Sequence, residues 1–299
     1  MIPATTDYVR LHFIVILFGF TGIIGKMITI PAVEMVFYRT LLAAAGMGLF
    51  LLLTKQETRV SLRDLIILLL VGFIVSIHWL TFFISGRIAN VSVSLVGFAT
   101  ASFWTAFLEP IMNRTRIKPL EVFLGLFVLS GLIIIFASDF NYSIGMVIAI
   151  LSGFTCAIFA IINARLVKRI NANTITFYQM IGATIATALF FPVYQATWAA
   201  GNHLNLMPQP MDWFWLLVLA LLCTVYAYST AVELFRRISV FLFQLTLNLE
   251  PVYGILLALL VFGESEKMNF HFYTGTFIIL CAVFAYPFMK KRLQPTSPS

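Results

Sequence analysis

Ten long apolar segments follow one another along the chain, separated by short polar stretches. Each has roughly twenty residues, the length that an α-helix needs to cross a bilayer. A transmembrane β-barrel would instead alternate apolar and polar residues over about ten residues. Because backbone groups inside lipid must bond within their own segment, we predict an all-α integral membrane protein. Its ten transmembrane helices are expected at about residues 8–28, 34–54, 64–86, 91–113, 119–137, 144–168, 173–198, 212–235, 240–262 and 270–290.

The composition excludes a water-soluble globular protein. Hydrophobic residues make up 61% of the 299 residues and charged residues only 10%, whereas soluble domains have about 25% charged residues. Ten crossings use roughly 200–230 residues, which leaves no room for a folded domain outside the membrane. Arg10 is the only basic residue at the start of the first apolar segment, and no small-residue cleavage site in a polar stretch follows the segment, so we expect a retained helix and not a signal peptide.

The basic residues predict the orientation. Of the 19 Lys and Arg residues, fifteen lie on one side of the membrane in the ten-helix arrangement, and the other side has Lys26, Arg87 and Lys267. Loops rich in Lys and Arg stay in the cytoplasm, so both termini are predicted to be cytoplasmic. The protein itself is predicted to lie in the inner membrane of the cell. The net charge of +7 is thus explained by the membrane topology and does not indicate a binding patch. We expect membrane lipid as a partner and no nucleic acid.

Short matches in the same order divide the chain into two halves. The first segment reads ILFGFT over Ile16–Thr21 and the sixth reads ILSGFT over Ile150–Thr155. Further pairs are Phe37-Tyr38 with Phe177-Tyr178, Arg87-Ile88 with Arg237-Ile238, Leu95 with Leu245, and Gly125 with Gly275. We predict two five-helix repeats, residues 1–140 and 141–299. Because five is odd, the second repeat is inverted in the membrane, an architecture of secondary transporters whose substrate site lies near the midplane.

Several motifs resemble a known family. The ninth segment contains Asn248-Leu249-Glu250-Pro251-Val252-Tyr253, continues to Gly263-Glu264, and is followed by Gly275. This is similar to the second repeat of EamA-type transporters in the drug/metabolite transporter superfamily. Arg39 in the second segment, His78-Trp79 in the third and Glu109-Pro110 in the fourth add to the resemblance. The first half departs from the pattern, since Thr100-Ala101 and Arg114 stand where the second half has Glu250-Pro251 and Glu264.

The resemblance implies a carrier of small organic solutes that often exports amino acids or related metabolites. It also implies a central cavity lined by the first, third, fourth, sixth, eighth and ninth helices, with the fifth and tenth mainly supportive.

Glu250 is the most deeply placed acidic residue, about ten residues into the ninth segment. It is either a cavity carboxylate that binds a cationic group or a proton, or a neutral, hydrogen-bonded structural residue beside the helix break at Pro251. Asn248 lies about 200° around an ideal helix from Glu250, whereas Gln244 and Asn248 share a face. Unless Pro251 rotates one of them, only one set faces the cavity.

The other candidates are polar or aromatic residues on helix faces. Three helix faces carry such residues. One has Phe98, Ser102, Thr105 and Glu109, the second has His78, Thr81 and Ser85, and the third has Tyr226, Thr230, Glu233 and Arg237. Ser and Thr in such helices often serve as interhelical contacts, and His78 is either a proton shuttle or a packing residue. Glu233 and Arg237 predict a local ion pair, and Arg39 and Lys26 are expected to extend to water at the outer surface. The substrate-binding candidates are His78, Trp79, Ser102, Tyr226, Asn248 and Glu250.

Catalytic and metal-binding signatures are missing from the sequence. The three cysteines, Cys156, Cys223 and Cys281, lie inside apolar segments without metal-ligand spacing, so we interpret them as packing thiols. We expect no enzyme activity, no cofactor and no metal. The sequence favours a secondary transporter that exports amino acids or similar amphipathic metabolites by alternating access, with protons as the candidate coupling ion. The alternatives are an efflux carrier for lipophilic cations, and a membrane scaffold or sensor that moves no solute.

Overall fold

The computed structural model describes residues 4–138, 142–250, 253–254, 257, 259–260, 263 and 269–293. These residues form helices, turns and loops. Seven helices within them are long and apolar enough to cross a membrane, which confirms an all-helical, multi-pass membrane protein. Their bounds are Thr5–Met27, Ala32–Leu53, Leu62–Ile88, Val91–Asn113, Ser143–Leu166, Ala172–Thr197 and Pro210–Leu234.

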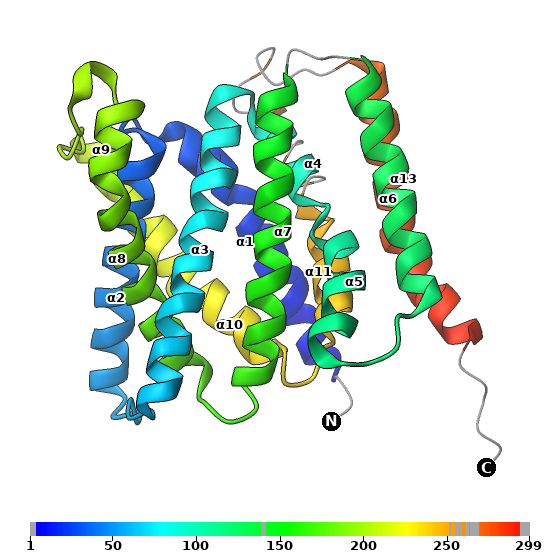
Figure 1. Cartoon of the computed structure of the whole chain (residues 1–299), viewed down its shortest axis with the longest axis horizontal. Helices are drawn as coiled ribbons and strands as arrows, with labels where there is room; N and C mark the ends of the chain where they lie inside the picture. The colour runs from blue at the N-terminus through cyan, green and yellow to red at the C-terminus, as the bar shows by residue number, and fades with distance from the viewer. Residues whose placement is uncertain are drawn as a thin grey trace.

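Three of the ten expected spans are not among these seven. Two of them coincide with the helices α6 (Pro119–Ser138) and α13 (Phe270–Leu293), which pack against each other at one side of the bundle (Figure 1). The third begins with α11 (Val240–Leu247) and continues into residues of which many, Pro251 and Glu264 included, lie outside the described part. The count of ten spans therefore stays a prediction.

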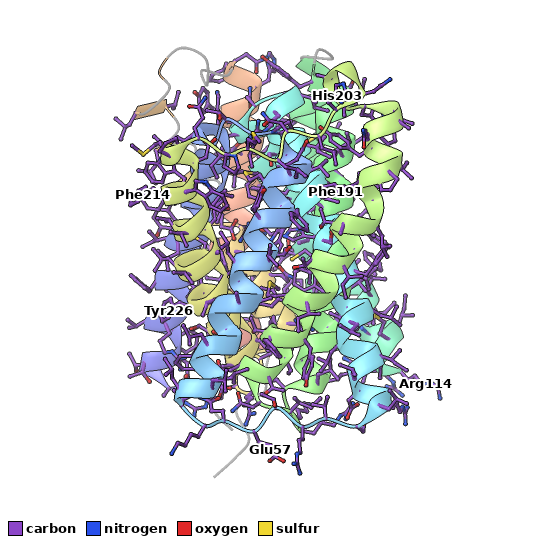
Figure 2. The ribbon with its side chains drawn as sticks, turned by 90° about the vertical axis from the view of Figure 1, so that its left-hand side faces the viewer. Glu57, Arg114, Phe191, His203, Phe214 and Tyr226 are labelled. Atoms are coloured by element: carbon purple, nitrogen blue, oxygen red, sulfur yellow. The ribbon has the colours of Figure 1, made fainter. Side chains whose placement is uncertain are left out.

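The helices stand side by side with both described ends of the chain at the same end of the bundle (Figure 1). α1 (Thr5–Met27) begins there and α13 ends there, and the segments that join α2 (Ala32–Leu53) to α3 (Leu62–Ile88) and α7 (Ser143–Leu166) to α8 (Ala172–Thr197) lie at this end too. Figure 2 shows Glu57 and Arg114 at this end and His203 at the other. We call it the basic end, because the loops and helix ends that meet there carry most of the Lys and Arg residues.

Side-chain caps start several of the helices at the ends of short loops. Ser61, Asn90, Asn171 and Ser239 each accept a hydrogen bond from a backbone N–H in the first turn of the helix that follows. Such residues satisfy N–H groups that have no partner inside the helix. The loops can therefore be short, which brings consecutive helices together as antiparallel neighbours.

The fourth segment is broken, contrary to the single helix expected over residues 91–113. α4 (Val91–Phe98) and α5 (Ala101–Asn113) are separated by a turn at Ala99 and Thr100. The ninth segment breaks at the equivalent place, since a turn at Asn248 and Leu249 follows α11. Each half of the chain thus has an interrupted helix at the same position in the repeat.

A pair of glycines lies where the two breaks pack into the bundle. A Cβ atom on Gly153 of α7 would lie 2.9 Å from the Phe98 carbonyl oxygen, so only glycine lets α7 approach the break between α4 and α5 this closely. Gly19 of α1 lies against the other break, where its Cβ would be 3.5 Å from the Glu250 carbonyl oxygen. The sequence matches align these two glycines. In each case the first helix of one half packs on the broken helix of the other half.

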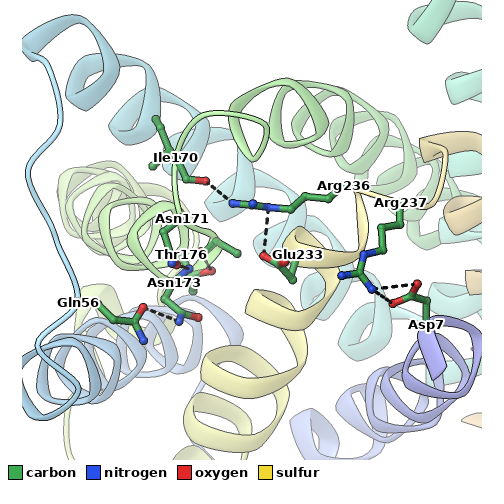
Figure 3. Close-up of polar contacts among 10 residues, drawn as sticks. Asp7, Gln56, Ile170, Asn171, Asn173, Thr176, Glu233, Arg236 and Arg237 are labelled. Carbon is green, nitrogen blue, oxygen red and sulfur yellow. Dashed lines mark hydrogen bonds and ion pairs between the residues drawn. The ribbon is translucent and has the colours of Figure 1, made fainter. Parts of the chain in front are cut away.

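Polar contacts at the basic end join the two halves (Figure 3). Arg237 Nη1 donates to both carboxylate oxygens of Asp7 in α1, at 3.2 and 3.4 Å. Arg236 forms an ion pair with Glu233, with 3.3 Å between Nε and Oε2. The expected pair of Glu233 with Arg237 is therefore wrong. Helix α10 (Ala227–Leu234) ends before either arginine, so the spacing of a continuous helix does not apply.

Candidate functional site

A cavity of about 70 Å³ lies inside the bundle, between the two halves. One water molecule needs about 10–15 Å³ measured in this way, so the cavity has room for about five to seven waters, the volume of a small organic molecule. The residues that line it come from α1, α2, α3, α4, α7, α10 and α11 and from Phe235 and Glu250: Phe18, Thr21, Arg39, His78, Trp79, Phe82, Phe98, Cys156, Phe159, Ala160, Asn163, Tyr228, Ala231, Val232, Phe243, Gln244 and Leu247.

These elements agree with the six helices that the family resemblance implies, with one addition. The second helix, α2, also reaches the cavity, through Arg39. α6 and α13 contribute none of the lining residues named above, as expected for supporting helices. α8 lies behind the lining and contacts α2 and α3.

The cavity wall is aromatic. The His78 ring lies 5.4 Å from the Phe98 ring and 5.3 Å from the Phe159 ring, measured between centroids. Trp79 contacts the edge of Tyr228 with centroids 6.0 Å apart. Pockets with apolar and aromatic walls and a few placed polar groups are typical small-molecule sites, and this cavity matches that description.

Arg39 is the principal functional candidate that sequence reasoning missed. The expectation that it extends to water is wrong, because its side chain is 2% exposed and lines the cavity. Its Nε donates to Thr224 Oγ1 at 2.9 Å, and its guanidinium carbon lies 4.0 Å from the centroid of the Trp79 ring. The position of Arg39, two turns after the start of α2, does suggest depth, but only the bundle shows that this face is turned inward.

A π-helical stretch explains why Tyr226 is not in the cavity. The eighth segment consists of α9 (Pro210–Leu217), the π-helix η3 (Val218–Tyr226) and α10. Thr224 Oγ1 donates to the Leu219 carbonyl five residues earlier, at 2.8 Å. The extra residue per turn shifts the register, so Tyr226 is 43% exposed on the outer face of the bundle (Figure 2). Tyr228 lines the cavity instead.

His78 is held in one orientation by α7. Its Nδ1 lies 2.8 Å from Ser152 Oγ and 3.0 Å from the Ser152 carbonyl oxygen, and Ser152 Oγ also donates to the His78 carbonyl oxygen at 3.0 Å. The carbonyl can only accept, so we assign the proton of the neutral ring to Nδ1. Nε2, the other ring nitrogen, is then left as a hydrogen-bond acceptor.

The ninth segment presents Glu250 to the cavity and turns Asn248 away from it. Gln244, Leu247 and Glu250 line the cavity, and Glu250 is 3% exposed. Asn248 Nδ2 donates to Ser102 Oγ of α5 at 2.9 Å, in a buried contact away from the lining. The expectation that only one of the two sets faces the cavity is therefore wrong, because Gln244 lines the cavity together with Glu250 and only Asn248 is turned away, at the turn that ends α11. The structure brings His78, Trp79 and Glu250 to one cavity and joins Ser102 to Asn248 as an interhelical contact.

A closed ring of hydrogen bonds joins two residues of the cavity lining, Asn163 and Tyr228, to Gln179 of α8. Asn163 Nδ2 donates to the Tyr228 hydroxyl at 3.0 Å, the hydroxyl donates to Gln179 Oε1 at 2.7 Å, and Gln179 Nε2 donates to Asn163 Oδ1 at 2.6 Å. All three side chains are buried. We call them the amide–tyrosine triad. It ties α7, α8 and α10 together and has its polar atoms paired.

The described residues contain no group of three or more His, Cys, Asp or Glu side chains that could hold a metal ion. Cys156, Cys223 and Cys281 are free, and Cys156 lies in the cavity wall. The chemistry of this site is therefore that of one carboxylate, one guanidinium, one imidazole and several aromatic rings.

The comparisons with known proteins agree with this arrangement. The sequence model of the EamA-like transporter family matches the chain twice, over residues 11–137 and 143–286. No curated protein matches the sequence significantly. Among solved structures, one titled only "Crystal structure of protein" aligns with a TM-score of 0.71 and 14% identity, covering 97% of this chain and 100% of that one. At this identity the alignment shows a shared fold.

Proposed function

The chain belongs to the EamA-like transporter family of membrane proteins, and we propose that it is a secondary transporter that exports amino acids or similar amphipathic metabolites by alternating access. The observation that carries this proposal is the cavity, because both halves of the chain line it and it contains Glu250 among aromatic walls. In transporters with inverted repeats, substrate sites lie between the repeats near discontinuous helices. Here the two broken helices contribute Phe98 and Glu250 to the lining.

The proposed topology has ten spans, with both termini in the cytoplasm and the repeats covering residues 1–140 and 141–299. The excess of Lys and Arg at the basic end supports this orientation in the inner membrane. The glycine pair Gly19 and Gly153, each packed on the broken helix of the opposite half, supports the inverted symmetry. The basic end then faces the cytoplasm.

Glu250 is proposed to bind the ammonium group of the solute or the coupling proton. In the part of the chain that the structure describes, no ion pair involves Glu250. A charged group at this depth costs about 2.5–3.5 kcal/mol on insertion scales. A carboxylate without a cation beside it is therefore expected to take up a proton or a positively charged ligand.

The test is transport into proteoliposomes, with amino acids as solutes and an imposed pH gradient. Wild type is expected to transport and to respond to the gradient. Glu250→Gln keeps the shape but cannot carry the charge, so it should lose the response. The control is Glu233→Gln, a half-exposed carboxylate at the basic end outside the cavity. Unchanged pH dependence in Glu250→Gln would show that protons are not coupled through this residue.

Two alternatives have distinct outcomes in the same vesicles. Efflux of lipophilic cations is favoured by the aromatic wall and Glu250, and competition by tetraphenylphosphonium would support it. The guanidinium of Arg39 in the same cavity repels a cation and argues for a solute that also carries an anionic group. A scaffold or sensor would move none of the solutes tested.

A further inference from the structure

Arg39 has hydrogen-bonding capacity that the described protein groups leave unused. A guanidinium has five N–H donors and no acceptor. The structure gives Arg39 one hydrogen bond, from Nε to Thr224 Oγ1. Among the described residues no carboxylate pairs with Arg39, and no oxygen accepts from its two NH₂ groups. The side chain nevertheless is 2% exposed and lies in the cavity wall.

Other arginines show how this protein satisfies guanidinium groups that have a structural role. Arg87 Nη2 donates to the carbonyl oxygens of Gly25 and Ile28, at 3.0 and 2.9 Å, where α1 ends. Arg237 pairs with Asp7, and Arg169 pairs with Asp64. Burying a cation without a partner is costly. Because Arg39 is the more deeply buried and has fewer protein partners, its missing partner is expected to come from outside the chain.

The contacts of Arg39 fix its orientation and leave one edge open. Thr224 holds Nε from η3, and the Trp79 ring covers one face of the guanidinium at 4.0 Å. Phe83 lies further away, at 5.6 Å from the guanidinium carbon. The remaining edge is formed by the two NH₂ groups, which is the geometry that binds the two oxygens of a carboxylate.

We propose that Arg39 binds the carboxylate of the transported solute, with Trp79 and Thr224 as positioning residues. This inference rests on the proposed function and specifies its substrate class. Glu250 lines the same cavity from the opposite half of the chain, and no ion pair joins it to Arg39 in the described residues. An unpaired cation and an unpaired carboxylate in one aromatic cavity match an α-amino acid zwitterion with an apolar side chain.

The experiment measures thermal stabilisation of the purified full-length chain by four probes with the same phenyl skeleton. L-Phenylalanine presents both an ammonium and a carboxylate. L-Phenylalaninamide and phenethylamine present only the ammonium, and 3-phenylpropionate presents only the carboxylate. A ligand that binds the folded state raises the apparent Tm. We expect L-phenylalanine to bind best, and its amide to bind about 10- to 100-fold more weakly because a hydrogen-bonded charge pair is lost.

Variants test whether Arg39 is the group responsible. Arg39→Gln should remove the preference for L-phenylalanine over its amide, and Arg39→Lys should retain part of it. Arg87→Gln is the matched control, since its guanidinium is used by backbone carbonyls, and it should keep the preference. If Arg39→Gln does not fold, Thr224→Val provides the second variant: it removes the Nε contact, together with the bond from Thr224 to the Leu219 carbonyl, but keeps the guanidinium, and it should weaken the preference without abolishing it.

The outcomes separate this inference from the transport proposal. Equal stabilisation of wild type by the acid and the amide, or a preserved preference in Arg39→Gln, would overturn the role of Arg39 while leaving transport possible. The role of Arg39 is also overturned, and transport is still left possible, if none of the twenty amino acids and no phenylpropionate raises the Tm. If carboxylates bind through Arg39 but no flux occurs in proteoliposomes, the transport proposal fails and the carboxylate site remains.

Discussion

Two groups of buried polar side chains in this bundle differ in how their hydrogen bonds are used. In the amide–tyrosine triad, Asn163, Gln179 and Tyr228 donate to one another in a closed ring. In the cavity, Arg39 uses one of its five donors and Glu250 has no ion pair among the described residues. A buried polar group whose bonds are all made inside the protein stabilises the fold. A buried polar group that faces a cavity and has unused hydrogen-bond donors or acceptors is available to bind a ligand.

Tyr228 belongs to both groups and marks the boundary between them. Its hydroxyl is part of the triad, whereas its ring lines the cavity beside Trp79 and Phe159. Substitutions that remove only the hydroxyl therefore test the structural group, and those that alter charge in the cavity test the binding group. The comparison predicts that stability and solute affinity respond to different sets of residues.

The largest expected effect on stability is that of Gln179→Leu. This change removes two of the three bonds of the ring and leaves Asn163 Oδ1 without its donor and the Tyr228 hydroxyl without its acceptor, which we expect to cost about 2–3 kcal/mol. Thermal unfolding in detergent measures it. The matched control is Gln195→Leu on the same helix, whose side chain is half-buried and donates to the Asn202 carbonyl. An equal drop in Tm in both variants would contradict a special role for the triad.

A smaller effect is expected for Tyr228→Phe. It removes the hydroxyl but keeps the ring in the cavity wall, so stability should fall by about 1 kcal/mol and the solute affinity should change little. Tyr226→Phe is the control two residues away, on the outer face (Figure 2), and should be neutral. A loss of transport in Tyr226→Phe without a change in Tm would restore that residue as a site candidate.

The smallest effect is expected for Ser102→Ala, which breaks the contact of Asn248 with α5. Interhelical hydrogen bonds in membrane proteins contribute about 0.6 kcal/mol on average. We therefore expect a small decrease in Tm and an unchanged solute affinity, because neither Ser102 nor Asn248 lines the cavity. A tenfold loss of affinity at constant Tm would place this pair in the binding site.

Most of the fold can be predicted from the sequence because a lipid bilayer allows few kinds of secondary structure to cross it. A run of about twenty apolar residues must be helical, and seven such helices are present where hydropathy predicts them. The repeat is also visible in the sequence, because the matching motifs align Gly19 with Gly153. At Gly153 the close approach of α7 to the break between α4 and α5 leaves no room for a Cβ atom.

The site was less predictable because it depends on departures from ideal helix geometry. The π-helix η3 moved Tyr228 inward and Tyr226 outward, and no periodicity of 3.6 residues reports such a change. The breaks at Ala99 and at Asn248 altered the faces of the fourth and ninth segments. Arg39 is mispredicted for another reason: a long side chain can reach water even from two turns inside a helix, and only packing shows that Thr224 and Trp79 hold it inside the bundle.

The most direct test of the central claim uses Cys156, a free thiol in the cavity wall. With Cys223 and Cys281 replaced by alanine, the rate at which methyl methanethiosulfonate modifies Cys156 is measured in proteoliposomes, with and without the amino acid that is transported fastest. If the solute occupies the cavity between the halves, saturating solute should slow the reaction several-fold, at the concentrations that saturate transport. An unchanged rate of modification at those concentrations would show that the solute binds elsewhere.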